Sequence, residues 1–176
     1  MENKLTTEKV VDVKDLHISF RTFKGYPHVL NGVNVHVNKK ERISIVGETG
    51  CGKTTTVNAI AQILARQARI DKGEIYFKGK DVLTMPQKEL KRLRAENVSI
   101  IFQDPIASLN PVFTIGQQLK EVIRYSGIEG AGDKKVQEEK AISALKETSL
   151  PDPERIMDSY PFQLSGGMRQ RICIAM

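Results

Sequence analysis

The sequence predicts an α/β fold with strands gathered in its first part and helices in its second. A short apolar run at residues 42–46 leads through a glycine-rich turn into apolar residues at helical spacing, which is typical of a strand–loop–helix unit. Beyond Gln103, strand-like alternation gives way to apolar residues spaced three or four positions apart. The 176 residues, 40% hydrophobic and 27% charged, suffice for the core of one ordinary domain.

The strands are read from alternation and from short apolar runs. Residues 10–20 and 29–37 alternate apolar and polar side chains, as a strand with one buried face does. Continuous apolar runs indicate strands that are buried on both faces. The strands expected in chain order are residues 10–20, 29–37, 42–46, 73–78 and 97–102.

The helices are read from apolar spacing and from end signals. Pro86 stands at the first turn of one helix and Ser165 at the N-cap of another, and both residue types favour these positions. Pro151 and Pro153 interrupt the helical pattern before the last of the expected helices. The helices expected in chain order are residues 53–69, 86–94, 115–125, 133–148 and a last one from 165 to 176.

Composition narrows the setting in which the chain works. Its net charge of +6 at pH 7 suits a polyanionic ligand, such as a nucleotide, a nucleic acid or a membrane surface, without choosing among them. No apolar run approaches the ~20 residues that a membrane-spanning helix needs. Cys51 and Cys173 have no metal-ligand spacing and cannot make a disulfide framework, so we expect a reducing, cytosolic compartment.

The segment from Gly47 to Thr54 (GETGCGKT) matches the phosphate-loop pattern G-x-x-x-x-G-K-[ST] at every required position. Its glycines let the backbone curl so that N–H groups point inward at an anion, and the helix that follows adds the positive end of its dipole. We expect Lys53 to reach the β- and γ-phosphates of a nucleotide and Thr54 to bind Mg²⁺. The alternative is a glycine-rich turn that merely precedes a helix.

A second glycine motif, LSGGMRQR, occupies residues 164–171. Ser165 is a good N-cap, and Gly166 and Gly167 leave the backbone N–H groups of the helix start bare, which makes a second anion site. The alternative is an ordinary capped helix start.

Together the two motifs resemble the nucleotide-binding subunits of ABC transporters, whose signature is LSGGQ. Met168 stands here where that signature has Gln. Residues 102–105 (FQDP) are similar to the Q-loop of the family. Residues 103–118, with LSGGMRQR, are similar to its peptide and nickel importer branch, where the first of two paired ATPases usually carries Met in the signature. The resemblance covers essentially the whole chain.

The resemblance implies a particular domain organisation. The fold would be a P-loop NTPase core of RecA-like type, with an N-terminal antiparallel β-subdomain and an inserted α-helical subdomain. Residues 1–103 would form the β-subdomain and P-loop core, residues 104–163 the α-helical subdomain, and residues 164–176 the signature and the start of its helix.

The resemblance also implies the site. In this family two subunits meet head to tail, so that the phosphate loop of one and the signature of the other enclose each ATP. Gln103 would sense the γ-phosphate and Mg²⁺. Phe20 would stack on adenine, with Phe23 as the alternative, or Phe20 is a core residue that ends the first strand. The implied ATP-binding residues are Phe20, Gly47, Glu48, Thr49, Gly50, Cys51, Gly52, Lys53, Thr54, Thr55, Gln103, Ser165, Gly166 and Gly167. The catalytic candidates are Lys53 and Gln103, and the candidate Mg²⁺ ligands are Thr54 and Gln103.

The catalytic machinery of the family continues past the signature. An apolar strand ending in Asp-Glu should follow, and later a histidine, and neither pattern is found here. His17, His28 and His36 all precede the phosphate loop. We therefore expect the chain to be incomplete at its C-terminal end and, as it stands, to bind a nucleotide without hydrolysing it.

The implied function is that of an ATP-binding subunit that powers the import of peptides or nickel from the cytoplasmic face of the membrane. Its partners would be membrane-spanning permeases, which residues 107–113 would approach, a second ATPase subunit and, indirectly, a solute-binding protein. No nucleic acid is expected. The alternative is a soluble ABC-type ATPase acting on nucleic acid or ribosomes. The net charge of +6 permits that alternative. The basic run at residues 88–94 could contact phosphates, but a solvated helix face is the favoured interpretation, and no aromatic residue interleaves with the run, as single-strand binding would favour.

Overall fold

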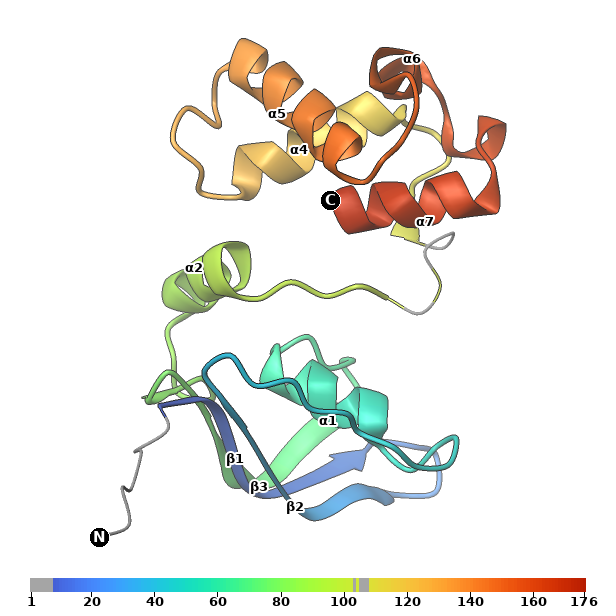
Figure 1. Ribbon diagram of the computed structural model, residues 1–176. Helices are drawn as coiled ribbons and strands as arrows, with labels where there is room; N and C mark the ends of the chain where they lie inside the picture. Colours follow the sequence, from blue (N-terminus) through green and yellow to red (C-terminus); the bar gives the residue numbers. More distant parts are fainter. Residues whose placement is uncertain (1–7, 103, 105–107) are drawn as a thin grey trace, which may run out of the picture. The chain divides into compact units, whose positions relative to one another are not determined.

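The structure is a computed structural model that describes residues 8–102, 104 and 108–176. The chain divides into two compact units, with the division between Leu90 and Lys91. The first unit holds an antiparallel sheet and one helix above it, and the second holds a cluster of helices (Figure 1). The fold is α/β, as the sequence predicts. The three subdomain ranges drawn from the sequence stay predictions.

The sheet of the first unit has four strands in the order β2-β1-β3-β4, and each neighbouring pair is antiparallel. Leu16 and Ile18 of β1 and Ile75 of β3 are fully buried and form the centre of its core. The expected strands at 10–20 and 29–37 are confirmed, whereas β3 begins at Ala68 and not at Gly73. The strands are β1 (Lys9–Phe20), β2 (His28–Asn38), β3 (Ala68–Phe77) and β4 (Lys80–Asp81).

Helix α1 (Lys53–Ile60) lies over one face of this sheet and ends well before Arg69 (Figure 1). Gln62 adopts a left-handed conformation, and its N–H donates to the carbonyl of Ala59, while the N–H of Ile63 reaches back to Asn58. This Schellman arrangement closes the helix. The prediction of a helix over 53–69 is therefore wrong in its second half. Helical spacing could not reveal that the chain from Ala68 onward pairs with β1, because that pairing is a long-range contact.

Residues 42–46 do not form the buried strand that their apolar run predicts. The segment is irregular and exposed, and Val46 reaches 91% exposure. A buried strand must find hydrogen-bonding partners for its backbone along its edges, and no strand among the described residues pairs with this one. The segment has the composition of a buried strand without the neighbours that would make it one.

Residues 97–102 depart from expectation in the same way. Helix α2 (Gln87–Asn97) continues to Asn97, and the residues from Val98 to Phe102 are irregular, with Ile101 and Phe102 exposed. Nothing in the described part of the chain pairs with this apolar run either.

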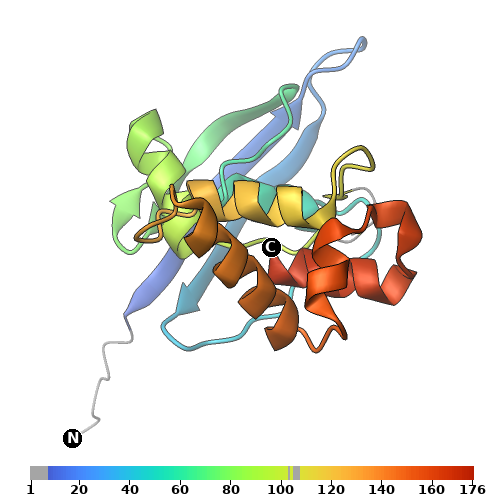
Figure 2. The same cartoon turned by 90° about the horizontal axis from the view of Figure 1, so that it is seen from above.

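The second unit is a set of helices packed around one core (Figures 1 and 2). The helices expected at 115–125 and 133–148 and after Ser165 are confirmed. A short helix with Pro153 at its start was not expected, although proline favours that position. The elements are α4 (Ile115–Tyr125), α5 (Lys134–Glu147), α6 (Pro153–Asp158), a 3₁₀ turn η1 (Pro161–Gln163) and α7 (Gly166–Ala175).

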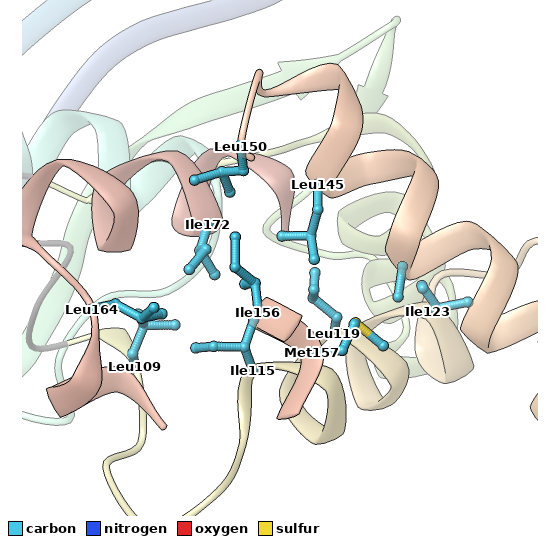
Figure 3. Packing of buried hydrophobic residues seen from close by; sticks show 11 residues of the cluster. Leu109, Ile115, Leu119, Ile123, Leu145, Leu150, Ile156, Met157, Leu164 and Ile172 are labelled. Carbon is cyan, nitrogen blue, oxygen red and sulfur yellow. The ribbon is translucent and has the colours of Figure 1, made fainter. Parts of the chain in front are cut away.

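The core of the second unit draws side chains from all these helices (Figure 3). Ile172 of α7 lies in it beside residues of α4, α5 and α6, so the helix that carries the second glycine motif is anchored by its own buried face. The core residues are Leu109, Ile115, Leu119, Ile123, Ala141, Leu145, Leu150, Ile156, Met157, Leu164 and Ile172.

Candidate nucleotide-binding site

The phosphate-loop segment is an exposed turn that leads directly into α1. Gly50 and Gly52 have φ angles of 86° and 95°, which side-chain-bearing residues rarely adopt. Gly52 is the N-cap of α1, and the helix begins with neither a side-chain cap nor an acidic residue in its first turn. The backbone N–H groups of the helix start are therefore available to an anion, and the helix dipole favours one there.

The ammonium of Lys53 lies within the curve of this loop. Its Nζ atom donates hydrogen bonds to the carbonyl oxygens of Gly47, at 2.8 Å, and Glu48, at 2.6 Å, and lies 3.7 Å from Sγ of Cys51. A positive charge is thus held where the loop curls. Because phosphate oxygens bind lysine ammonium groups strongly, this placement suits a polyphosphate.

Gly52 is the point at which the loop rests on the sheet. A Cβ atom there would lie 2.5 Å from Cδ2 of Leu30 and 3.2 Å from the carbonyl oxygen of Val29. Only glycine therefore fits between α1 and the start of β2. The hydroxyl of Thr56 donates to the Gly52 carbonyl at 3.0 Å and closes the first turn, while Thr54 remains exposed.

Phe20 flanks the same end of β2. It ends β1 half-buried, its N–H donates to the carbonyl of Pro27 at 3.1 Å, and the preceding residue, Ser19, pairs with His28. The first residues of β2 thus have Phe20 on one side and Gly52 on the other. Phe23, the alternative, is fully exposed in the turn that Thr22 closes with Gly25.

Ser165 caps helix α7 in the second unit, as the sequence predicts. Its hydroxyl oxygen accepts a hydrogen bond from the N–H of Met168 at 3.3 Å. Gly166 and Gly167 are exposed, and a Cβ atom on either would meet no atom within 4 Å. Nothing in the described part of the chain therefore requires glycine at these two positions.

A small cavity of about 260 Å³ adjoins this helix start. Arg171, whose guanidinium donates to the carbonyl of Ser149 at 3.0 Å, lines it together with Ser165 and Gly167. Sequence reasoning did not single out Arg171, although the sequence shows this basic residue about one and two-thirds turns after the cap. Its charge adds to the helix dipole in favouring an anion.

The remaining expectations concern metal, membrane and Gln103. Gln103 lies outside the described residues. Within the described ranges, no cluster of three or more His, Cys, Asp or Glu side chains could hold a metal ion. No helix in the described part of the chain combines the length and the apolar character that crossing a membrane requires.

Comparison with known proteins places the chain in a class. Residues 30–176 match the ABC transporter family, so the chain belongs to that family. It is 42% identical over 171 residues to the dipeptide transport ATP-binding protein DppD of Bacillus subtilis, covering 96% of this chain and 50% of that protein. It is 38% identical over 177 residues to a probable peptide ABC transporter ATP-binding protein, y4tR, of Sinorhizobium fredii, covering 100% of this chain and 52% of the relative. The chain thus spans about half the length of these curated relatives.

A solved structure agrees with this placement. The ATP-binding cassette MJ0796, in a dimeric post-hydrolysis state bound to ADP and Pi, superimposes with a TM-score of 0.78 at 26% identity, over 94% of this chain and 67% of that one. The likeness supports an ABC ATPase fold for the chain as a whole.

Proposed function

We propose that this chain belongs to an ATP-binding subunit that powers peptide import through an ABC transporter. The observation that carries the proposal is the Lys53 ammonium held inside an exposed phosphate loop at the start of α1. The relatives named above are ATP-binding proteins of peptide and dipeptide transport, and this favours peptides over nickel as the solute. The subunit would act at the cytoplasmic face of the membrane with permease subunits, a second ATPase subunit and, indirectly, a solute-binding protein.

In this proposal the residues of the first unit bind ATP and its Mg²⁺. The N–H groups from Gly47 to Thr55 and the Lys53 ammonium would hold the phosphates, and Phe20 would stack on the adenine, a contact worth roughly 1–3 kcal/mol. The Thr54 hydroxyl, exposed in the first turn of α1, would bind Mg²⁺ together with Gln103. When bound, Mg²⁺ would neutralise part of the negative charge of the phosphates.

The second part of the proposal is that Ser165, Gly166 and Gly167 act on ATP bound by another subunit. Glycine in a helix is roughly 1 kcal/mol less favourable than alanine. The two glycines at the start of α7 bear this cost although their own surroundings leave room for a side chain. The close approach of a group from outside the chain would explain why both positions are glycine. The dimeric state of MJ0796 supports a second subunit as the protein that brings this group.

The test measures uptake in cells whose intact protein carries Lys53→Ala, with Lys24→Ala as the matched control because Lys24 lies exposed in the Thr22–Gly25 turn. We expect Lys53→Ala to abolish uptake of a labelled dipeptide and Lys24→Ala to leave it unchanged. Loss of ⁶³Ni²⁺ uptake with intact dipeptide uptake would overturn the choice of solute. Unchanged uptake of both, with salt-sensitive binding of nucleic acid, would favour the soluble ATPase instead.

A further inference from the structure

An exposed aromatic pair stands directly before the glycine motif of the second unit. The rings of Tyr160 and Phe162 stack with centroids 5.5 Å apart and planes 14° from parallel. Phe162 is 70% exposed, and Tyr160 is exposed as well. Aromatic residues are enriched at the centres of protein–protein contacts, so a stacked pair facing solvent is a candidate contact.

The pair is held in a fixed position. Pro161 and Leu164, which alternate with the exposed residues, are both buried. The N–H of Tyr160 donates to Oε1 of Gln163 at 2.7 Å, and the N–H of Gln163 donates back to the carbonyl of Tyr160 at 3.0 Å. A contact surface that is already ordered loses little conformational entropy when a partner binds.

The distance to Ser165 decides which partner reaches the pair. Three Cα–Cα steps separate Phe162 from Ser165, so their Cα atoms are at most about 11 Å apart. A specific interface covers about 800 Å² on each partner, a disc of roughly 16 Å radius. A protein that seats a nucleotide on Ser165 and Gly167 is therefore large enough to reach Phe162 as well.

We propose that the Tyr160–Phe162 pair is a contact for the second ATPase subunit, at the edge of the surface through which Ser165 meets that subunit's nucleotide. The inference rests on the proposed function, because it takes the partner of Ser165 to be another ATPase. Gln163, which stands between Phe162 and Ser165 in the chain, is exposed and uncharged.

The test measures pairing of the intact protein by sedimentation equilibrium with AMP-PNP and Mg²⁺. The variants are Phe162→Ser, Phe162→Tyr, which keeps a ring, and Ser165→Arg. The matched control is Tyr125→Ser, which removes a ring that is 67% exposed. Tyr125 suits this purpose because it lies at the far end of α4 from the aromatic pair. The N–H of Ile115, the first residue of α4, donates to the carbonyl of Ser159, next to Tyr160. Tyr125 is about 15 Å further along the helix.

We expect Phe162→Ser to weaken pairing about tenfold or more, while Phe162→Tyr and Tyr125→Ser pair as the unmodified protein does. Binding of AMP-PNP by the separate subunit and the circular dichroism spectrum should be unchanged in all of them. Normal pairing of Phe162→Ser alongside failed pairing of Ser165→Arg would overturn the inference and leave the proposed function standing. The same result with loss of co-purifying permease would assign the pair to the membrane subunits. Pairing that is insensitive to Ser165→Arg, or absent in the unmodified protein, would instead refute the proposal that Ser165 acts on ATP bound by another subunit.

Discussion

At the scale of single residues, Lys53 has the most direct link between position and function. Its ammonium is placed by two carbonyl oxygens of the loop that it closes. A hydrogen bond to a charged group contributes about 1.5–3 kcal/mol, so we expect Lys53→Ala to weaken ATP binding roughly tenfold or more. Isothermal titration of the folded variant measures this directly. An unchanged affinity would remove Lys53 from the phosphate site.

Glycines at two helix starts should respond oppositely to the same substitution. Gly52→Ala forces a Cβ atom onto Leu30 and Val29 at a φ of 95°, so we expect it to destabilise the chain by at least about 1–2 kcal/mol. Gly166→Ala meets open space and should leave stability unchanged or raise it by up to about 1 kcal/mol. Thermal unfolding of both variants gives the comparison, and equal destabilisation would contradict the close packing of Gly52 against β2.

The two cysteines should differ in reactivity. Cys51 is exposed in the phosphate loop, whereas Cys173 is partly buried in α7, and burial raises the pKa of the Cys173 thiol. A raised pKa leaves less thiolate at a given pH, and thiolate is the reactive form. We expect a thiol reagent at pH 8 to label Cys51 faster than Cys173, and bound ATP to protect Cys51. Peptide mass mapping resolves the two sites, and similar rates without an ATP effect would count against the assignment.

At the scale of elements, α4, α5 and α7 could be predicted from the sequence because their start signals are local. Thr114 and Gln117 form a reciprocal capping box at the start of α4, and Asp133 and Ser165 cap α5 and α7. The strands were harder because their partners lie far along the chain. The phosphate loop and the glycine motif are also local patterns, so both candidate sites could be proposed from the sequence, and the roles of their residues stay predictions.

Helix α7 offers a test of how its packing supports the signature. Ile172 is 0% exposed in the core of the second unit, whereas Ile174, two residues on, is 50% exposed. We expect Ile172→Ala to cost about 2–5 kcal/mol of unfolding free energy, and Ile174→Ala less than about 1 kcal/mol. Urea unfolding of the 176-residue chain measures both, and a similar loss for the two would mean that α7 is seated differently.

At the scale of the whole molecule, what sequence reasoning missed is long-range. Residues 42–46 and 98–102 have the apolar composition of buried strands, yet both are irregular, with 42–46 exposed throughout and Ile101 and Phe102 exposed in the second segment. Composition describes what a segment can do in a sheet, while pairing depends on neighbours elsewhere in the chain. The relatives named above are about twice as long as this chain. No strand among the described residues pairs with either segment.

The last prediction concerns turnover. Phosphoryl transfer depends on positioning and on charge stabilisation, with little covalent chemistry from the protein. Lys53 and the N–H groups at the start of α1 supply the positive part of that machinery. The resemblance to ABC ATPases assigns the carboxylates that fix Mg²⁺ and orient water to a segment after the signature helix. We therefore expect the 176-residue chain to bind ATP without hydrolysing it above background, and a version extended to the length of its relatives to hydrolyse it. Phosphate release from the two, purified side by side, decides the matter. Equal turnover would mean that the catalytic groups already lie among these 176 residues.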